Sequence, residues 1–243
     1  MTAFVSIIIP TLNEEMYLEP TLRSIKNQSY DGPYEIIVSD GGSKDRTLEI
    51  AKKYADKIIK VRKKGIGTGR NAGAKESEGE ILIFIDADTL LIYNTLAEII
   101  KTFRDREIVG AAVPLLPIST KAVDVIIFLG INGFVKLNAE HGKGHARVVG
   151  SCCAYRKSVF EKVGGFDEEI RALEDFNLSE KISNLGKIKY VEETLALVST
   201  RRIAKWGRIK SVKNYTSLYL KHLLREKGLG QFSIKEESYK PVR

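Results

Sequence analysis

The first half of the chain alternates short apolar runs with stretches in which apolar residues recur every three or four positions. The apolar runs are typical of buried β-strands, and the three-to-four spacing is typical of amphipathic helices. The expected strands are 4–9, 35–39, 57–61, 81–85 and 108–113, and the expected helices are 14–28, 44–54, 68–76 and 94–103. Nearly continuous apolar strands between amphipathic helices predict an α/β fold, Rossmann-like, with a mostly parallel sheet flanked by helices.

The alternation changes after Pro114 and Pro117. We expect an apolar helix to about residue 137 and a loop over 138–147, then strands 148–155, 187–191 and 196–199 with helices 157–163, 172–184 and 204–226. The apolar run 122–137 is shorter than the roughly 20 residues of a membrane-spanning helix, and polar residues interrupt it. We therefore expect no transmembrane helix.

Composition fits one compact globular unit, because 43% of the 243 residues are hydrophobic and 29% are charged. The two cysteines, Cys152 and Cys153, are adjacent, so they exclude a disulfide framework and fit a reducing compartment. The N-terminus has no basic region or cleavage site of a signal peptide, so we expect a cytoplasmic protein. The net charge of +8 lies in the tail: residues 201–243 carry +9 and residues 1–200 carry −1.

Acidic residues stand where two expected strands end. Asp86 and Asp88 follow the buried run 81–85, and side chains two apart in an extended chain share a side, which suits a hard divalent cation and substrate phosphates. The structural alternative is that Asp88 caps the next helix. Asp40 follows strand 35–39 before two glycines, where it can accept a hydrogen bond from a ligand or simply form an Asx-turn.

Two further polar segments complete the candidate site. Pro10, Thr11, Asn13 and Glu14 follow the first strand, and helix capping explains part of their pattern. In a parallel sheet, Thr11, Asp40 and Asp86 would converge on one crevice. Glu174 and Asp175 begin an amphipathic helix, where a carboxylate can serve as general base or only complement the helix dipole.

Two other patterns have plainer interpretations. Residues 67–72 match the dinucleotide fingerprint G-x-G-x-x-A, but they follow the third strand rather than the first, which disfavours a nicotinamide cofactor. His141 and His145 flank a glycine-rich segment and fit a solvated loop better than a metal site.

Taken in order, these segments resemble the family-two glycosyltransferases with the GT-A fold. The matching segments are 10–14, 39–45, 69–73, 86–88, 164–168 and 174–175, within roughly residues 4–185. Each segment alone is weakly specific, and the ordered set is highly specific.

The resemblance implies an inverting transfer from a nucleotide-diphosphate sugar to an acceptor hydroxyl or phosphate. It places Pro10, Thr11, Asn13, Glu14, Asp40, Arg70, Asp86, Arg202 and Trp206 on the donor, and Asp88 with Asp86 on Mn²⁺ or Mg²⁺. Asp175, beside Glu174, would be the general base. A divalent cation suits the charge that gathers on the leaving nucleoside diphosphate.

The resemblance also divides the chain. It implies a transferase domain over 1–200, with a donor half of about 1–115 and an acceptor half of 116–200, and a basic helical extension over 201–243. UDP is favoured over GDP as the donor nucleotide, and the acceptor is an unidentified glycan or lipid. Residues 202–206 resemble an R-x-x-R-W element with Lys205 in place of the second Arg, which favours a single sugar addition over polymerisation.

The tail adds a hypothesis about location. Trp206, Ile209, Val212, Tyr215 and Tyr219 recur at helical spacing beside basic residues, as in helices at the surface of an anionic membrane. The preferred alternative is that this stripe docks on its own domain. Two other functions compete with the transferase: a non-catalytic module that binds anionic surfaces, and a sugar nucleotidyltransferase. Nucleic acid is not favoured as a partner. The sequence leaves the oligomeric state open.

Overall fold

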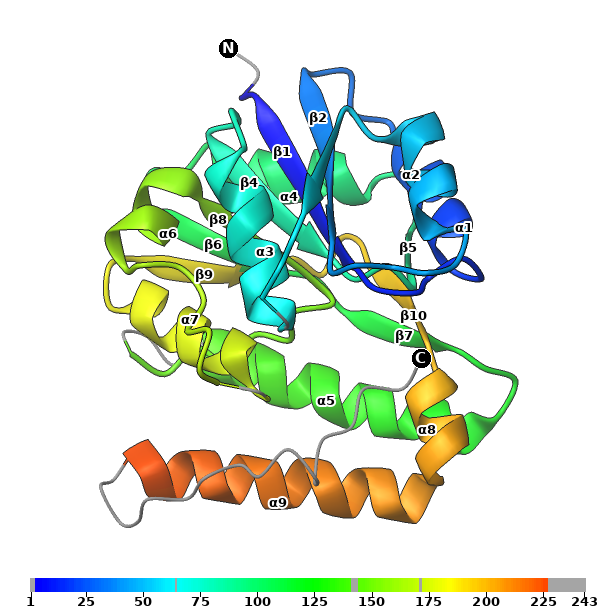
Figure 1. Ribbon diagram of the computed structural model, residues 1–243. Helices are drawn as coiled ribbons and strands as arrows, with labels where there is room; N and C mark the ends of the chain where they lie inside the picture. The colour runs from blue at the N-terminus through cyan, green and yellow to red at the C-terminus, as the bar shows by residue number, and fades with distance from the viewer. Residues whose placement is uncertain (1–2, 64, 141–143, 171, 227–243) are drawn as a thin grey trace.

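The computed structural model describes residues 3–63, 65–140, 144–170 and 172–226. Its centre is a seven-stranded sheet in the order β3-β2-β1-β4-β8-β6-β9 (Figure 1). The strands are β1 (Val5–Thr11), β2 (Tyr34–Asp40), β3 (Lys57–Lys60), β4 (Ile81–Ile85), β6 (Ile108–Ala112), β8 (Cys152–Arg156) and β9 (Lys187–Tyr190). Only β8 runs antiparallel to its neighbours, β4 and β6, so the predicted mostly parallel sheet is confirmed.

A smaller sheet of three strands extends this centre. Its order is β5 (Thr89–Leu91), β10 (Ala196–Ser199) and β7 (Leu115–Ile118). The sequence predicted β10 but missed β5 and β7, because β5 has three residues and β7 contains Pro117. β7 pairs only with β10 in this sheet, and an edge strand tolerates a proline that cannot donate to a second partner.

Helices cover both faces of the large sheet (Figure 1). They are α1 (Leu18–Lys26), α2 (Thr47–Tyr54), α3 (Ile66–Lys75), α4 (Thr95–Thr102), α5 (Ala122–Glu140), α6 (Lys157–Lys162), α7 (Glu174–Ser183), α8 (Arg201–Trp206) and α9 (Arg208–Glu226). α1 begins four residues later than predicted, because Asn13 adopts a left-handed conformation with φ 56° and Glu14 starts a turn. The single helix predicted over 204–226 is divided at Gly207, whose φ is 81°.

The core lies on the two faces of the sheet. Along β1, Ile7 and Ile9 face one apolar cluster and Ile8 faces the other, as the period of two in a strand requires. α1 and α4 supply the first cluster with Leu22 and Leu96. This two-sided burial explains why β4 is an unbroken apolar run and why β1 carries three isoleucines in succession.

The glycines of α3 have a packing explanation. A Cβ at Gly73 would lie 2.5 Å from Ile8 Cγ2, and a Cβ at Gly69 would lie 3.2 Å from Pro10 Cβ. The glycines therefore allow α3 to lie directly on β1. Of the two glycines in the G-x-G-x-x-A pattern, Gly69 therefore packs on β1, and a Cβ at Gly67 would lie 3.3 Å from Phe166 Cβ.

The helix α5 is longer than predicted. It continues to Glu140, and its segment Ala122–Ala139 is long and apolar enough to cross a membrane by length and composition. The expectation that no segment of the chain reaches this length is therefore wrong. Only 22% of that segment is buried, which differs from an ordinary core helix.

Candidate active site

The carboxyl ends of β1, β2 and β4 form the floor of the candidate site. Thr11 and Asp40 are paired in register at the ends of β1 and β2, and the Thr11 hydroxyl donates to Asp40 Oδ1 at 3.2 Å. Asp86 follows β4, which neighbours β1 on the other side. The three strand ends therefore lie side by side at one edge of the sheet, and their convergence on a donor crevice stays a prediction.

The Asp40 carboxylate is hydrogen-bonded to the loop that follows β2. The backbone N–H groups of Gly42 and Ser43 donate to its Oδ2 at 3.0 and 2.9 Å, and the Ser43 hydroxyl donates to Oδ1. Asp40 is also 1% exposed. The structure therefore has the Asx-turn arrangement that was the structural alternative, and contact between Asp40 and a donor stays a prediction.

Asn13 joins the loops after β1 and β2. Its side-chain oxygen accepts from the Lys44 N–H at 2.8 Å, and its own N–H donates to the Ser43 hydroxyl at 2.8 Å. These bonds hold Asn13 in the left-handed region, which is costly for a residue with a Cβ. Since Glu14 comes next, the strained residue fixes where the Glu14 carboxylate lies.

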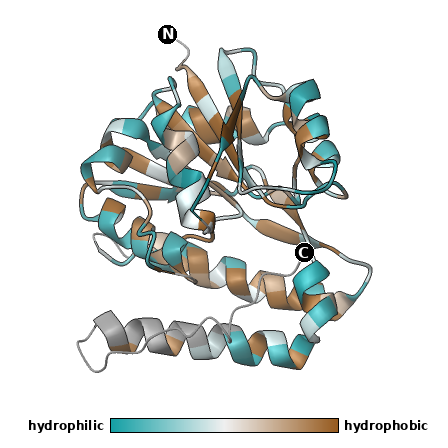
Figure 2. Ribbon diagram, in the orientation of Figure 1, coloured by the Kyte–Doolittle hydropathy of each residue, from teal (hydrophilic) through white to brown (hydrophobic). Residues whose placement is uncertain are grey.

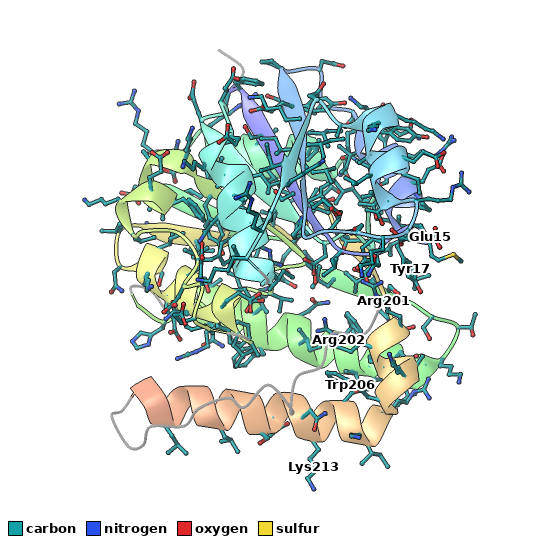
Figure 3. The ribbon with its side chains drawn as sticks, viewed as in Figure 1. Glu15, Tyr17, Arg201, Arg202, Trp206 and Lys213 are labelled. Atoms are coloured by element: carbon teal, nitrogen blue, oxygen red, sulfur yellow. The ribbon has the colours of Figure 1, made fainter. Side chains whose placement is uncertain are left out.

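Arg201, at the start of α8, binds two of the predicted acidic residues. Its guanidinium donates to both carboxylate oxygens of Glu14, at 2.6 and 2.9 Å, and its Nε lies 2.8 Å from Asp88 Oδ2. The same guanidinium stacks 4.5 Å from the centroid of the Tyr17 ring (Figure 3). The two segments are 187 residues apart in sequence. Glu14 and Asp88 therefore share one positively charged partner, the guanidinium of Arg201.

Asp88 has an unusual environment for a carboxylate. Burial, with the charge of Asp86 in addition, raises the pKa of Asp88 to about 6 despite the nearby Arg201. The described residues contain no group of three or more His, Cys, Asp or Glu side chains placed to hold a metal. Two carboxylates nevertheless suit Mg²⁺ or Mn²⁺ when diphosphate and water supply the other oxygens, so Asp86 and Asp88 fit the cation that the resemblance implies.

Arg70 links Asp86 to the predicted base. Its side chain is 2% exposed and donates to Asp86 Oδ1 at 2.8 Å, to Glu174 Oε1 at 2.9 Å and to the Gly150 carbonyl at 3.0 Å. The Phe166 ring lies 5.1 Å from the guanidinium carbon. Arg70 therefore acts on the site by holding two acidic segments together, and its predicted contact with the donor stays a prediction.

Glu174 and Asp175 start α7 directly after Leu173, which has a left-handed φ of 61°. Asp175 is half-buried, and its Oδ2 accepts from the Gly150 N–H at 2.7 Å. Burial raises the pKa values of both carboxyls, and Arg70 opposes the rise. Glu174 is buried and held by Arg70, whereas Asp175 is the more exposed member of the pair, and its two oxygens accept from the Gly150 and Phe176 N–H groups.

The helix α8, which carries the predicted donor residues Arg202 and Trp206, borders a cavity of about 420 Å³ beside Asp88. Tyr17, Leu90 and Ile118 give it apolar walls, with Asp88 and Arg201 among its polar lining. Arg202 stacks 5.8 Å from the Trp206 ring in α8 (Figure 3). Arg201 of α8 thus reaches the acidic residues Glu14 and Asp88, and donor contacts of Arg202 and Trp206 stay predictions.

Several residues of the site were not predicted from the sequence. Tyr17 has no distinguishing motif, and Gly150 acts through its backbone N–H and carbonyl, which any residue type carries. Gly150 had one usable signal, its small size: a Cβ there would lie 2.7 Å from the Arg70 guanidinium. His145 is exposed, in keeping with a solvated loop, and His141 lies outside the described residues.

The family model described as "Glycosyl transferase family 2" matches residues 6–164. The chain belongs to this family. Among curated relatives, the probable glycosyltransferase YdaM of Bacillus subtilis is 29% identical over 198 residues, covering 75% of this chain and 47% of YdaM. The chain thus spans about half the length of that relative.

Solved structures share the fold of this family 2 chain. TarS residues 1–349 of S. aureus, in complex with UDP-GlcNAc, gives a TM-score of 0.66 at 22% identity, covering 81% of this chain and 58% of that one. The mannosyltransferase PcManGT of Pyrobaculum calidifontis, in complex with GDP-Man and Mn²⁺, gives 0.65 at 21% identity, covering 79% and 56%. The predicted GT-A fold is confirmed by these likenesses.

Proposed function

We propose that this chain is an inverting glycosyltransferase that moves a sugar from a nucleotide-diphosphate sugar to an acceptor hydroxyl or phosphate. The observation that carries the proposal is Arg70, which joins Asp86 at the donor side to Glu174 beside the predicted base. Family membership supports the class of enzyme over a binding module or a nucleotidyltransferase. Neighbours with UDP-GlcNAc and GDP-Man support a nucleotide sugar as donor, with UDP as our favoured nucleotide.

Asp175 is the proposed general base. The Gly150 N–H fixes one carboxylate oxygen, and the raised pKa of the Asp175 carboxyl makes it a better proton acceptor than an exposed aspartate. Arg70 pairs with Glu174, while the oxygens of Asp175 accept from the backbone N–H groups of Gly150 and Phe176, and a direct displacement needs only one base. The acceptor oxygen then attacks the anomeric carbon as the bond to the diphosphate breaks, which inverts the configuration.

Asp86 and Asp88 would hold Mn²⁺ or Mg²⁺, which when bound offsets the charge that develops on the leaving diphosphate. In the structure, Arg201 is ion-paired with the Asp88 carboxylate, so a cation would compete with Arg201 for it. The Mn²⁺ in PcManGT and in GalNAc-T7 structures supports such a cation here. The acceptor proposed is a glycan or lipid of the cell envelope, and each acceptor molecule receives a single sugar rather than a polymer.

Calorimetry tests the donor site first. We expect one class of nucleotide or nucleotide sugar to bind with Mn²⁺, and Asp88→Asn to weaken that binding at least tenfold. Asp31→Asn, at an exposed position, is the matched control. Failure of every nucleotide to bind the folded wild-type chain would overturn the proposed function.

A second measurement tests the base. Asp175→Asn should leave donor binding intact while the release of nucleoside diphosphate from the bound donor slows roughly 100-fold or more. Undiminished turnover in this variant would exclude Asp175 as the base without excluding the donor site.

A further inference from the structure

The outward face of α5 is apolar. The side chains of Val123, Ile126, Leu129 and Leu137 are between 44% and 66% exposed. The opposite side of the helix packs on the domain through Phe128, Val135 and Ala139. A surface helix of a globular protein normally turns polar residues outward, so α5 is apolar on both sides (Figure 2).

Polar contacts fix the inner side of α5 to the domain. The Asn132 amide donates to the Leu115 carbonyl at 2.8 Å and accepts from the Leu115 N–H at 2.9 Å. Asp124 is 2% exposed and receives the Arg208 guanidinium at 2.7 Å. A helix that crossed a bilayer would lose these contacts, so the described arrangement suits a helix that lies along a surface.

The helix α9 adds positive charge to the same side of the molecule. The Arg208–Asp124 pair attaches the start of α9 to the start of α5, and α9 lies beyond α5 from the sheet (Figure 1). Residues 201–226 carry eight Lys or Arg and one acidic residue. Ile209, 88% exposed, and Val212 show that the predicted docking of this stripe on its own domain is wrong for the start of α9; the side chains of Tyr215 and Tyr219 lie outside the description.

We propose that the outward face of α5, together with the exposed side of α9, docks on the surface of an anionic lipid bilayer. The apolar side chains of α5 can enter the acyl-chain region of such a bilayer, and the basic side chains of α9 can bind its negatively charged head groups. Lys213 points away from α5 into solvent, where it can meet a head group (Figure 3). A second copy of the chain fits less well, because it would bring the same positive charge to the contact.

Vesicle flotation of the full chain tests this proposal. Vesicles of phosphatidylcholine alone are compared with vesicles that also contain phosphatidylglycerol, at low and high salt. We expect binding to the anionic vesicles, and we expect the double variant Ile126→Glu with Leu129→Glu to bind roughly tenfold or more weakly. Both positions are exposed, so the folded chain tolerates the charge. Tyr93→Glu, 72% exposed on another surface, is the matched control and should bind as the wild type does.

Each other outcome overturns the proposal. Absence of binding to anionic vesicles excludes a bilayer as the occupant. If vesicle binding disappears at high salt but is unchanged in the double variant, the binding comes from the positive charge of the tail and does not involve α5. A concentration-dependent dimer that the double variant dissociates, without vesicle binding, identifies a second copy instead. Resistance to alkaline extraction would indicate a spanning helix. Calorimetric donor binding is measured in parallel and does not depend on this face, so failure here leaves the proposed function standing.

Discussion

Replacement of Arg70 by methionine tests the central link of the site. The wild-type side chain is fully buried, and its guanidinium is shared between Asp86, Glu174 and the Gly150 carbonyl. Methionine has similar length and no charge, so Arg70→Met leaves the carboxylates without their counter-charge and creates little empty volume. Removing one partner of a buried ion pair typically costs about 3–5 kcal/mol.

The loss of folding stability in Arg70→Met should depend on pH. Arg70 lowers the pKa of Glu174 while burial raises it, so without Arg70 that pKa rises further above the usual 4.5 of a glutamate. A raised pKa in the folded state means that protonation stabilises the fold at low pH, and that this stability is lost as pH rises through the folded pKa. The deficit of Arg70→Met is therefore about 3–5 kcal/mol near pH 8 and smaller near pH 5, where Glu174 is protonated with or without Arg70. Because the pKa of Glu174 is about 7 in the wild type, the two deficits should differ by up to about 1.4 kcal/mol.

Denaturant unfolding at these two pH values measures the effect. For a chain of this size, the deficit near pH 8 corresponds to a fall in Tm of about 10 °C. The double variant Arg70→Met with Glu174→Gln should recover much of the stability, because the buried charge is gone. Arg23→Met, in an exposed pair with Glu19, is the control and should cost under about 1 kcal/mol. A deficit that is equal at both pH values, or is not recovered by Glu174→Gln, would refute the reasoning.

Three further predictions follow from single contacts. Because the pKa of Asp88 is about 6, Mn²⁺ binding in the presence of UDP, followed by calorimetry, should weaken as pH falls below 6, up to about tenfold per unit. Arg201→Ala removes the cation that competes for Asp88, so Mn²⁺ affinity should rise; unchanged or weaker binding contradicts this competition. Gly73→Ala places a Cβ 2.5 Å from Ile8 Cγ2 and should lower the free energy of unfolding by about 1–3 kcal/mol, whereas Gly130→Ala, with open space around it, should not.

The sequence predicted those parts of the molecule that depend on local pattern. The apolar run 81–85 and the acidic residues Asp86 and Asp88 are neighbours in the chain, so a strand that ends in carboxylates is visible without a structure. The helix α7 was likewise visible from helical spacing, predicted over 172–184 and found at Glu174–Ser183. β5 and β7 were missed because they are short and form only by pairing with β10, about 80 or more residues later in the chain.

The partners of the acidic residues could not be predicted in the same way. Arg70 binds Glu174 across 104 positions, and Arg201 binds Glu14 across 187. Nothing in the local pattern around either arginine distinguishes a buried ion pair from an exposed cation. The motif order suggested a contact between arginine and nucleotide, whereas the structure shows arginines that already hold the carboxylates.

The two ends of α8 connect the candidate active site to the proposed membrane face. Arg201 at its start is bound to Glu14 and Asp88, and Arg208, just beyond its end, is bound to the buried Asp124 of α5. α8 buries none of its six residues, so these ion pairs are prominent among the contacts that hold it. A cation at Asp88 competes with Arg201 alone and leaves the Arg208 pair intact. Because Arg201 also holds both carboxylate oxygens of Glu14, loss of its Asp88 contact leaves α8 attached at both ends, so we expect cation binding at Asp88 and the attachment of α9 to α5 to be independent of each other.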